Sequence, residues 1–256
     1  MEVHHHAHTP PKGQARKKWR HYFWEFLMLF LAVFCGFLAE YQLEHKIEKD
    51  RAKQYIISLY EDIRNDTLRI NQLLGYNEKK IEALKNMYSC YDTVLKDLKA
   101  TACMGTLIIH SRSNRGFVLT DRTLRQLANA GGYRLLDKED ADSIIAYENM
   151  YKGYLDFQTT VFQQSQDNVR ITLNQMADFK VLAPHQTTTA AVLADTAAGK
   201  LSGPLLFTED RVLLNKWFNE LSMYIRTTNG QRNSMIQLKN KAINLLHYYK
   251  DKHHFE

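Results

Sequence analysis

The sequence predicts an all-α protein in which an N-terminal transmembrane helix continues into an elongated antiparallel helical bundle. Three observations indicate this fold. Proline and glycine are scarce, with 4 and 11 among 256 residues, and apolar residues recur at spacings of three and four along most of the chain. A long uncharged apolar run also lies near the N-terminus. The scarcity of turn residues argues against a many-stranded sandwich.

Residues 1–21 form a basic, histidine-rich arm that we expect in the cytoplasm. The net charge is +4 in this arm, −2 in residues 22–42 and +4 in residues 43–256, which is close to neutral for their length. A nucleic-acid-binding protein carries clustered basic residues with aromatic residues between them, and here only the short arm is basic. We therefore expect no nucleic-acid partner.

Residues 22–42 are expected to form a transmembrane signal anchor. The run FLMLFLAVFCGFLA, residues 26–39, is uncharged, and with residues 22–25 it forms a segment of eighteen residues. Such a helix is about 27 Å long, close to the roughly 30 Å of a bilayer's hydrocarbon core. Aromatic residues that favour the membrane interface flank the run, namely Trp19, Tyr22, Trp24 and Tyr41.

A cleaved signal peptide is the alternative to an anchor. Cleavage after Ala39 would place Phe37 at a position that requires a small residue, and Phe34 precedes Cys35 where a lipoprotein signal also needs one. We therefore expect the segment to stay uncleaved. Because Lys and Arg resist translocation, the basic arm predicts a cytoplasmic N-terminus and an extracytoplasmic C-terminal domain.

Residues 43–256 are expected to form the helical bundle. Its first long helix, residues 43–98, carries a heptad repeat at Ile56, Ile63, Ile70, Asn77, Leu84, Tyr91 and Leu98. Gly75 is the expected weak point of this helix. Asp66 and Asn77 interrupt its apolar face, as polar residues that fix register do in bundles.

The rest of the chain predicts, in order, a loop at 101–119, a short helix at 120–130, a long helix at 137–179, a loop at 181–207 and a long helix at 208–250. Thr120, Asp137 and Thr208 are the expected N-caps, and Gly131 with Gly132 closes the short helix. Amphipathic helices of this length must pack along one another to bury their apolar stripes.

Two apolar seams define the faces of the later long helices. The seam of helix 137–179 comprises Leu155, Phe162, Val169 and Met176. The seam of helix 208–250 comprises Leu214, Trp217, Leu221, Tyr224, Thr228, Gln231, Met235, Leu238, Ala242, Leu245 and Tyr249.

Four histidines in the arm, His4, His5, His6 and His8, are weak candidates for a metal site because imidazole binds Zn²⁺, Ni²⁺ and Cu²⁺. A structural metal site needs supporting groups around its ligands, and a short arm offers none. We therefore expect a solvated arm without a resident metal or other cofactor.

Cys90 and Cys103 are the candidate disulfide. In an oxidising compartment a bridge over thirteen residues would stabilise the fold by about 3 kcal/mol. Two buried free thiols are the other interpretation, and it is the preferred one because cysteine is a common small core residue. Cys35 lies in the apolar run and is expected to pack there.

No enzymatic motif occurs in the sequence: it contains no nucleophile elbow, HExxH helix, phosphate loop or paired cysteines. The acidic residues of two helices are expected on surfaces or in first turns, where solvation explains them: Glu61, Asp62, Asp66, Glu139, Asp140 and Asp142. The polar run 110–116 could bind an anion through its arginines, although exposed loops are polar in any case. We expect a protein that is not an enzyme.

The order of segments resembles a group of uncharacterised bacterial single-pass membrane proteins, with an anchor and a helical extracytoplasmic domain of unknown function. That group has the pattern K-x-x-L-x-x-L-x-x-D-I/L after the anchor, which Tyr55, Leu59 and Asp62-Ile63 match approximately. A later T-x-x-x-L-x-x-S-G-x-L-x-L-I turn is matched loosely by Thr123, Leu127, Gly131, Tyr133 and Leu135. The resemblance covers roughly residues 19–160 and supplies no catalytic or ligand residues.

The resemblance implies a single-pass protein of the inner (cytoplasmic) membrane of a Gram-negative bacterium, with its bundle in the periplasm. We expect a non-enzymatic interaction or scaffold module of the cell envelope, held in the lipid bilayer and paired with an envelope protein or with itself. The alternative is a periplasmic ligand-sensing bundle. An arm of about twenty residues cannot form an output domain, so such a sensor would signal through a separate partner protein.

Overall fold

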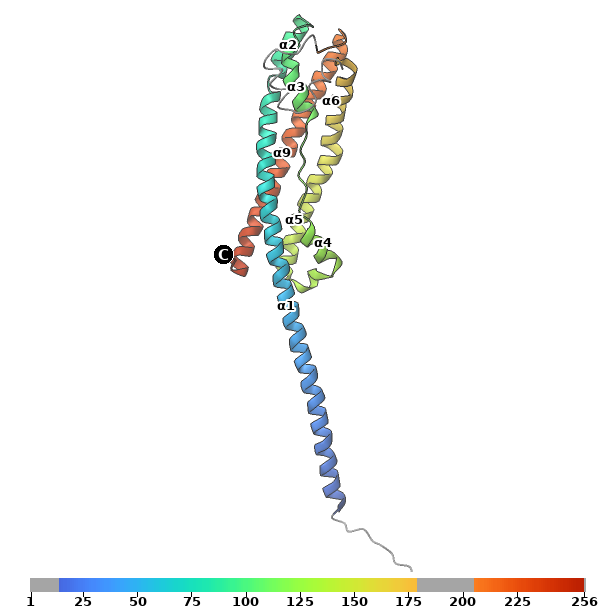
Figure 1. Ribbon diagram of the computed structural model, residues 1–256, viewed down its shortest axis with the longest axis vertical. Helices are drawn as coiled ribbons and strands as arrows, with labels where there is room; N and C mark the ends of the chain where they lie inside the picture. The colour runs from blue at the N-terminus through green and yellow to red at the C-terminus, as the bar shows by residue number, and fades with distance from the viewer. Residues whose placement is uncertain (1–13, 179–204, 256) are drawn as a thin grey trace, which may run out of the picture. The chain divides into compact units, whose positions relative to one another are not determined.

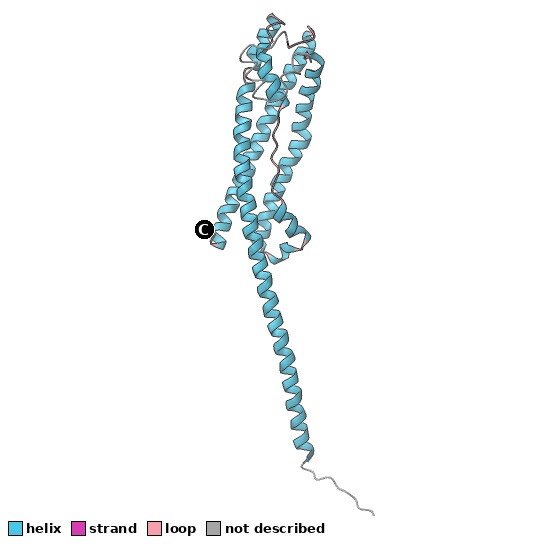
Figure 2. Cartoon of the chain, in the orientation of Figure 1, coloured by secondary structure: helices cyan, strands magenta, loops and turns pink. Residues whose placement is uncertain are grey.

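The computed structural model describes residues 14–178 and 205–255, and the described residues confirm the all-α fold. Figure 2 shows helices and loops without a β-strand among these residues, which contain one isolated β-bridge, between Ala177 and Leu206. The chain divides into two compact units, Met1–Gln54 and Tyr55–Glu256.

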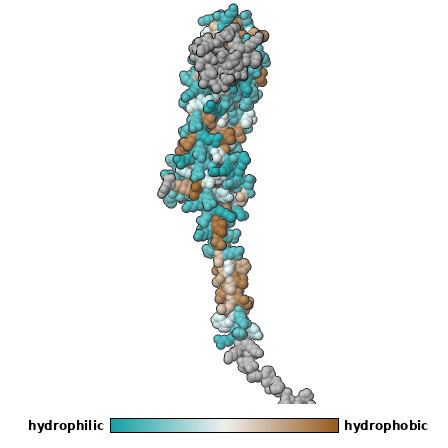
Figure 3. All heavy atoms as spheres, in the orientation of Figure 1, coloured by the Kyte–Doolittle hydropathy of each residue, from teal (hydrophilic) through white to brown (hydrophobic). Residues whose placement is uncertain are grey.

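The first unit contains the beginning of helix α1, Gln14–Leu84. Within the described part of the chain, α1 is the one helix long and apolar enough to cross a membrane, and its apolar window has no buried residue. Brown apolar side chains gather there in Figure 3. Trp19, Tyr22, Trp24 and Tyr41 are all exposed on α1. Such a continuous apolar surface indicates contact with lipid or another apolar partner, and the interfacial role of the four aromatic residues stays a prediction.

The second unit is a helical bundle (Figure 1). Its helices, besides α1 from Tyr55 onward, are α2 (Met87–Lys96), α3 (Ala102–Arg112), α4 (Arg122–Asn129), α5 (Lys138–Phe157), α6 (Gln163–Met176) and α9 (Arg211–His253). A 3₁₀ turn, Gly132–Leu135, follows α4, and a π-helical turn, η2 (Gln158–Phe162), joins α5 to α6. Helix α9 packs along α5, η2 and α6.

Neighbouring rods of this bundle run in opposite directions. Three side chains of α1 bond to the segment that follows α3: Lys80 to Ser113, Asp66 to Thr120 and Asp62 to Thr123. Earlier residues of α1 thus pair with later residues of that segment, which is the pattern of antiparallel packing. Residues 113–121, which are not helical, therefore continue from the short helix α3 and run antiparallel to α1. Helix α9 runs antiparallel to α5 and α6, because Lys252 bonds to Asp140 whereas Thr227 bonds to Ser165.

Two apolar cores fill the bundle. One core lies among the end of α1, α2, α3, η2, α6 and the first half of α9, and it includes Phe162, Trp217 and Leu221. The other lies among α1, α4, α5 and the second half of α9, and it includes Ile63, Tyr147 and Leu238. A fully buried side chain of this kind stabilises the fold by about 1.5–3 kcal/mol. All eleven seam positions expected for α9 are buried, which confirms that interpretation.

The extent of the first helix differs from the expectation. Helix α1 ends at Leu84 instead of continuing to 98, and α2 begins at Met87. Gly75 lies inside α1, which continues without a break to Leu84, so the helix is not interrupted at the expected weak point. The new start at Met87 buries Cys90 and Val94 against the core.

The segment expected as a loop at 101–119 contains helix α3. Its buried residues Met104, Leu107 and Ile108 form an apolar face, and the polar residues that predicted a loop are concentrated after this face. Because the segment as a whole is polar, its apolar first half did not stand out as a helix. The expected loop at 181–207 lies mostly outside the described residues. Its flanks meet through hydrogen bonds between Asp178 and Leu205 and between Phe207 and Met176, each 2.8 Å long.

A π-helical turn interrupts the expected long helix 137–179. Tyr147 and Tyr154 are buried before the turn, and Phe162, its last residue, and Val169 continue the buried stripe. The step from 154 to 162 is eight residues instead of seven, because the π turn inserts one residue. Leu155, which the uninterrupted heptad placed in the seam, is consequently 40% exposed.

Two of the three expected N-caps are wrong. Asp210 caps α9, accepting from the N–H groups of Val212 and Leu213, so Thr208 lies outside the cap. Asp121, not Thr120, precedes α4. Asp137 does precede α5, although its side chain makes no capping bond. Gly131 adopts the expected left-handed conformation, with a φ of 62°.

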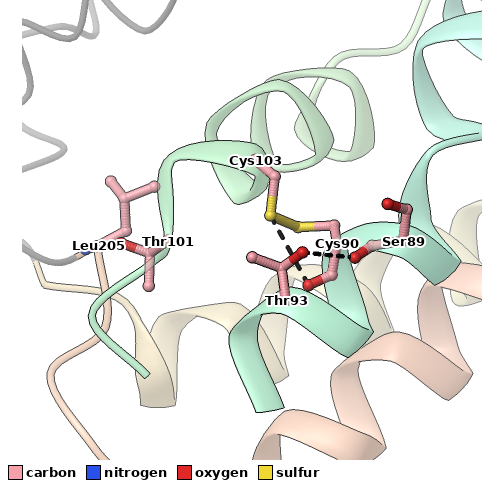
Figure 4. The surroundings of a disulfide bond; sticks show 6 residues. All are labelled: Ser89, Cys90, Thr93, Thr101, Cys103 and Leu205. Atoms are coloured by element: carbon pink, nitrogen blue, oxygen red, sulfur yellow. Dashed lines mark hydrogen bonds between the residues drawn. A yellow bond between two sulfur atoms is a disulfide. The ribbon is translucent and has the colours of Figure 1, made fainter. Parts of the chain in front are cut away.

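Cys90 of α2 and Cys103 of α3 form a disulfide (Figure 4). The structure therefore contains the bridge and not the preferred pair of free thiols. Close to this bridge, the Thr101 hydroxyl oxygen accepts a hydrogen bond from the Leu205 N–H at 2.9 Å. The bridge and this bond together tie α2, α3 and the segment leading to α9 at one end of the bundle.

Candidate functional site

A layer of polar side chains crosses the interior of the bundle around a lysine. This Lys80 layer comprises Asn77, Lys80, Ser113, Gln158, Gln166, Tyr224, Thr228 and Gln231. Asn77 and Lys80 belong to α1 and are both fully buried. They fall in its inward stripe because Leu73, Asn77, Lys80 and Leu84 follow one another at alternating spacings of four and three.

The Lys80 ammonium group contacts one carbonyl and two aromatic rings. Its Nζ donates to the Ser113 carbonyl oxygen at 2.8 Å. It also lies 4.6 Å from the centre of the Tyr224 ring and 5.4 Å from that of Phe162. A cation over an aromatic face is attracted by the negative charge of the π system. In the described part of the chain, no carboxylate forms an ion pair with Lys80.

The carbonyl groups at the C-terminal end of α3 explain why polar groups gather here. The last carbonyls of a helix lack partners within the helix and carry partial negative charge. Gln166 Nε2 donates to the carbonyls of Ser111 and Arg112, both at 3.3 Å. The Tyr224 hydroxyl donates to the Ser113 carbonyl at 3.3 Å, beside the bond from Lys80. Side chains of three other helices thus donate hydrogen bonds to the carbonyl groups at the end of α3.

A chain of carboxamides continues the layer across the bundle. Asn77 Nδ2 donates to Gln231 Oε1 at 3.1 Å, and Gln231 Nε2 donates to Gln158 Oε1. Gln158 belongs to the π-helical turn η2. These bonds link α1, α9 and η2 through buried amides. Asn77 thus has the register-fixing contacts expected of a polar residue on the apolar face.

Burial governs the charges of this layer. Loss of hydration lowers the pKa of Lys80 from 10.5 to about 7. Burial also lowers the pKa of the half-buried His110, and the nearby positive charge of Lys80 lowers it further. The pKa of the Tyr224 phenol is raised, mainly by burial. Near neutral pH the layer therefore holds an amine that changes its charge.

Several polar atoms around Lys80 have no hydrogen-bond partner among the described residues. They are Asn77 Oδ1, His110 Nδ1, Ser113 Oγ and Asn114 Oδ1. Buried polar groups of this kind usually bind ordered water. The layer is suited to holding water and a titrating proton. It is not suited to nucleophilic attack, because a fully buried amine cannot reach a substrate.

A second polar region fixes α4 to α1 and corrects the expectation of surface carboxylates. Asp62 and Asp66 are buried, and they accept hydrogen bonds from Thr123 and Thr120. Burial raises the pKa of Asp66, although the bonds from Thr120 and the charge of Arg69 favour its ionised form. Asp140 lies in the first turn of α5, as expected, but it is also buried. These three carboxylates connect structural elements, and this role explains their burial.

Apart from the polar run 110–116, the other candidate residues lie away from the Lys80 layer or outside the described residues. His4, His5, His6 and His8 lie outside the described residues. Cys35 is a free, exposed cysteine of α1. Within residues 14–178 and 205–255, no group of three or more His, Cys, Asp or Glu residues could hold a metal ion. The polar run 110–116 contributes carbonyls to the layer, and the Arg115 guanidinium lies 4.8 Å from the Tyr76 ring centre.

Lys80 was not among the residues expected at a site, although the sequence contains a signal for it. A lysine three residues after Asn77 and four before Leu84 falls on the inward face of α1. The heptad repeat counted along α1 steps from Asn77 directly to Leu84 and passes over Lys80, which concealed the signal. No protein-family model, curated protein or solved structure matches this chain. The resemblance to bacterial single-pass proteins therefore stays a prediction.

Proposed function

We propose that this chain is a single-pass protein of the inner membrane whose bundle acts outside the cytoplasm as a non-enzymatic interaction module of the cell envelope. The apolar surface of α1 supports the membrane attachment. The basic arm before it supports a cytoplasmic N-terminus, because positive residues stay on the cytoplasmic side. By this proposal the bilayer is the first partner and an envelope protein, or a second copy of the chain, is the other.

The disulfide between Cys90 and Cys103 is the observation that carries this proposal. Structural disulfides form and persist in oxidising compartments such as the periplasm and are rare in the cytosol. The basic arm predicts that the bundle lies outside the cytoplasm. The bridge supports the same orientation, and it is an independent property of the chain. A scaffold role fits the buried carboxylates, because their hydrogen bonds join separate helices of the bundle.

Two experiments test the proposal. The first uses two fusions after Glu256. A fusion to alkaline phosphatase should be active, and a fusion to a fluorescent protein that matures only in the cytoplasm should stay dark. The opposite pattern would overturn the orientation. Crosslinking in intact cells should give a discrete partner or dimer band, whereas monomer alone with several crosslinkers would refute the interaction role.

A ligand-sensing bundle is the second candidate, and the Lys80 layer is the observation that favours it. A buried amine with unpartnered polar neighbours could respond to a small molecule or to protons within the bundle. A specific ligand stabilises the folded state and raises the melting temperature by several degrees at saturating concentration. Envelope metabolites can be screened for such a shift. A metabolite that raises the melting temperature of the unaltered chain but not that of a Lys80→Met variant would favour sensing over scaffolding.

A further inference from the structure

A groove between α6 and α9 lies on the surface of the bundle, apart from the Lys80 layer. This Glu220 groove has a volume of about 330 Å³. Gln164, Ser165 and Asn168 line one side, and Asn219, Glu220 and Met223 line the other. The volume falls at the lower end of the range for small-molecule sites, roughly 300–1,000 Å³. The groove is therefore large enough for a small organic ligand.

Glu220 gives the groove its charge. Its side chain is 18% exposed, and its Oε2 atom is buried without a hydrogen-bond partner among the described residues. Its other oxygen pairs with the exposed Lys216 at 3.9 Å, the outer limit of an ion pair. Among the described residues that line the groove there is no Lys, Arg or His. A carboxylate that is largely withdrawn from water and weakly paired favours a cationic ligand over a neutral or anionic one.

The other groups around the groove limit the kind of cation. Three carboxamides, on Gln164, Asn168 and Asn219, supply carbonyl oxygens that accept N–H bonds. The hydroxyls of Ser165 and Thr227 lie 2.8 Å apart and join the two helices at this position. Val161 and Met223 are about half exposed and offer an apolar surface. This combination suits a short aliphatic chain that carries an ammonium group.

The local fold supports a binding role for this position. Val161, at the edge of the groove, belongs to the π-helical turn η2. Turns of this type are rare and occur frequently at functional sites. The extra residue that shifts the apolar register between Tyr154 and Phe162 also sets the rotation of the residues that line the groove on α6.

We propose that the Glu220 groove binds a small organic cation, an ammonium group on a short aliphatic chain, with Glu220 as its counter-ion. This inference goes beyond the interaction role and holds whichever membrane face the bundle occupies. The ammonium bonds to the Glu220 carboxylate and to the neighbouring carboxamide oxygens. The aliphatic chain contacts Val161 and Met223.

Calorimetric titration of the detergent-solubilised full-length chain tests the proposal, with 1,4-diaminobutane as the probe and 1,4-butanediol as its neutral analogue. The diamine should bind saturably at one site, more weakly at high salt, and the diol should not bind. Glu220→Gln should weaken diamine binding about tenfold or more, as expected for loss of a charge-assisted bond. Asp251→Asn removes an exposed carboxylate from the same helix and should leave binding unchanged.

Met223→Arg provides a second test that leaves Glu220 in place. Met223 is half exposed, so an arginine is tolerated there by the fold, and its charge should exclude the diamine. Circular dichroism of each variant should match the unaltered chain. The proposal is overturned by the absence of saturable diamine binding, by equal binding of diamine and diol, or by unchanged affinity in folded Glu220→Gln or Met223→Arg protein.

Discussion

Asp62 of α1 accepts hydrogen bonds from both the hydroxyl and the backbone N–H of Thr123, at 2.5 and 3.3 Å. One turn along α1, Asp66 accepts bonds from the hydroxyl and the N–H of Thr120, at 2.7 and 3.1 Å. Helix α4 has no capping bond from its own N-cap side chain. Asp62 of α1 therefore caps the first turn of α4 from a distant part of the sequence, and Asp66 holds the residue just before the N-cap.

Removing the Thr123 hydroxyl should destabilise the bundle. Thr123→Val leaves the buried Asp62 carboxylate with one bond fewer, so the free energy of unfolding should fall by about 1–3 kcal/mol. Urea unfolding followed by circular dichroism measures the change. Thr159→Val is the control, because the exposed Thr159 bonds only to carbonyls of its own turn. Equal effects of the two substitutions would contradict the remote-capping role.

The stability of the bundle should rise with pH because of Lys80. Its pKa is about 7 in the folded chain and 10.5 when unfolded, so between these values the unfolded state binds more protons. The destabilisation is therefore fully present below pH 7 and disappears as the pH rises toward 10.5. Each pKa unit corresponds to about 1.4 kcal/mol, which gives a contribution of several kcal/mol.

Lys80→Met should remove this pH dependence and stabilise the chain at pH 6, because an apolar side chain of similar length carries no charge to bury. Unfolding free energies measured from pH 6 to pH 10 test this. Lys79→Met, at an exposed neighbouring position, should keep the dependence of the unaltered chain. The same pH slope in Lys80→Met as in the unaltered chain would show that Lys80 is not the titrating group.

Breaking the disulfide should lower the stability without unfolding the bundle. Cys90 and Cys103 are 13 residues apart, and a loop of this size contributes about 3 kcal/mol in the chain-entropy model. Replacing both with serine should lower the free energy of unfolding by that order. A reducing agent should have a similar effect on the unaltered chain and none on the double variant. Sensitivity of the double variant to reductant would contradict this account.

Asp140 should hold the C-terminal end of α9 against α5. It accepts from Tyr248 at 2.8 Å and from Lys252 at 2.9 Å, and its second oxygen lies 3.2 Å from His253 Nε2. Asp140→Asn should speed amide hydrogen exchange in the last two turns of α9 and leave the turns around Leu221 unchanged. Asp142→Asn, at an exposed position, should change neither region. Uniform exchange across α9 in both variants would refute the local role.

The fold was predictable where a regular spacing continued without interruption. Helix α9 buries all eleven expected positions because nothing inserts a residue along its 43-residue length. Between Tyr154 and Phe162 one inserted residue changes the register, and a spacing extrapolated from one side fails on the other. Helix α3 escaped prediction because its short apolar face adjoins a strongly polar run.

The candidate site was less predictable because its contacts join distant segments. The bonds from Thr123 to Asp62 and from Lys80 to Ser113 span 61 and 33 residues. No local pattern specifies such partners, and a polar residue on an inward face signals only that some partner is required. Asp66 and Asn77 gave that signal, whereas their partners Thr120 and Gln231 became evident only in the folded chain.

Labelling with a membrane-impermeant maleimide tests the central claim most directly. In a Cys35→Ser background, Asn240→Cys places a thiol on an exposed face of the bundle, and Ala15→Cys places one in the basic arm. On intact spheroplasts, which expose the outer face of the inner membrane, the account predicts labelling of Asn240→Cys alone, with Ala15→Cys labelled only after detergent is added. Labelling of Ala15→Cys with protection of Asn240→Cys, or recovery of the chain in the soluble fraction, would contradict it.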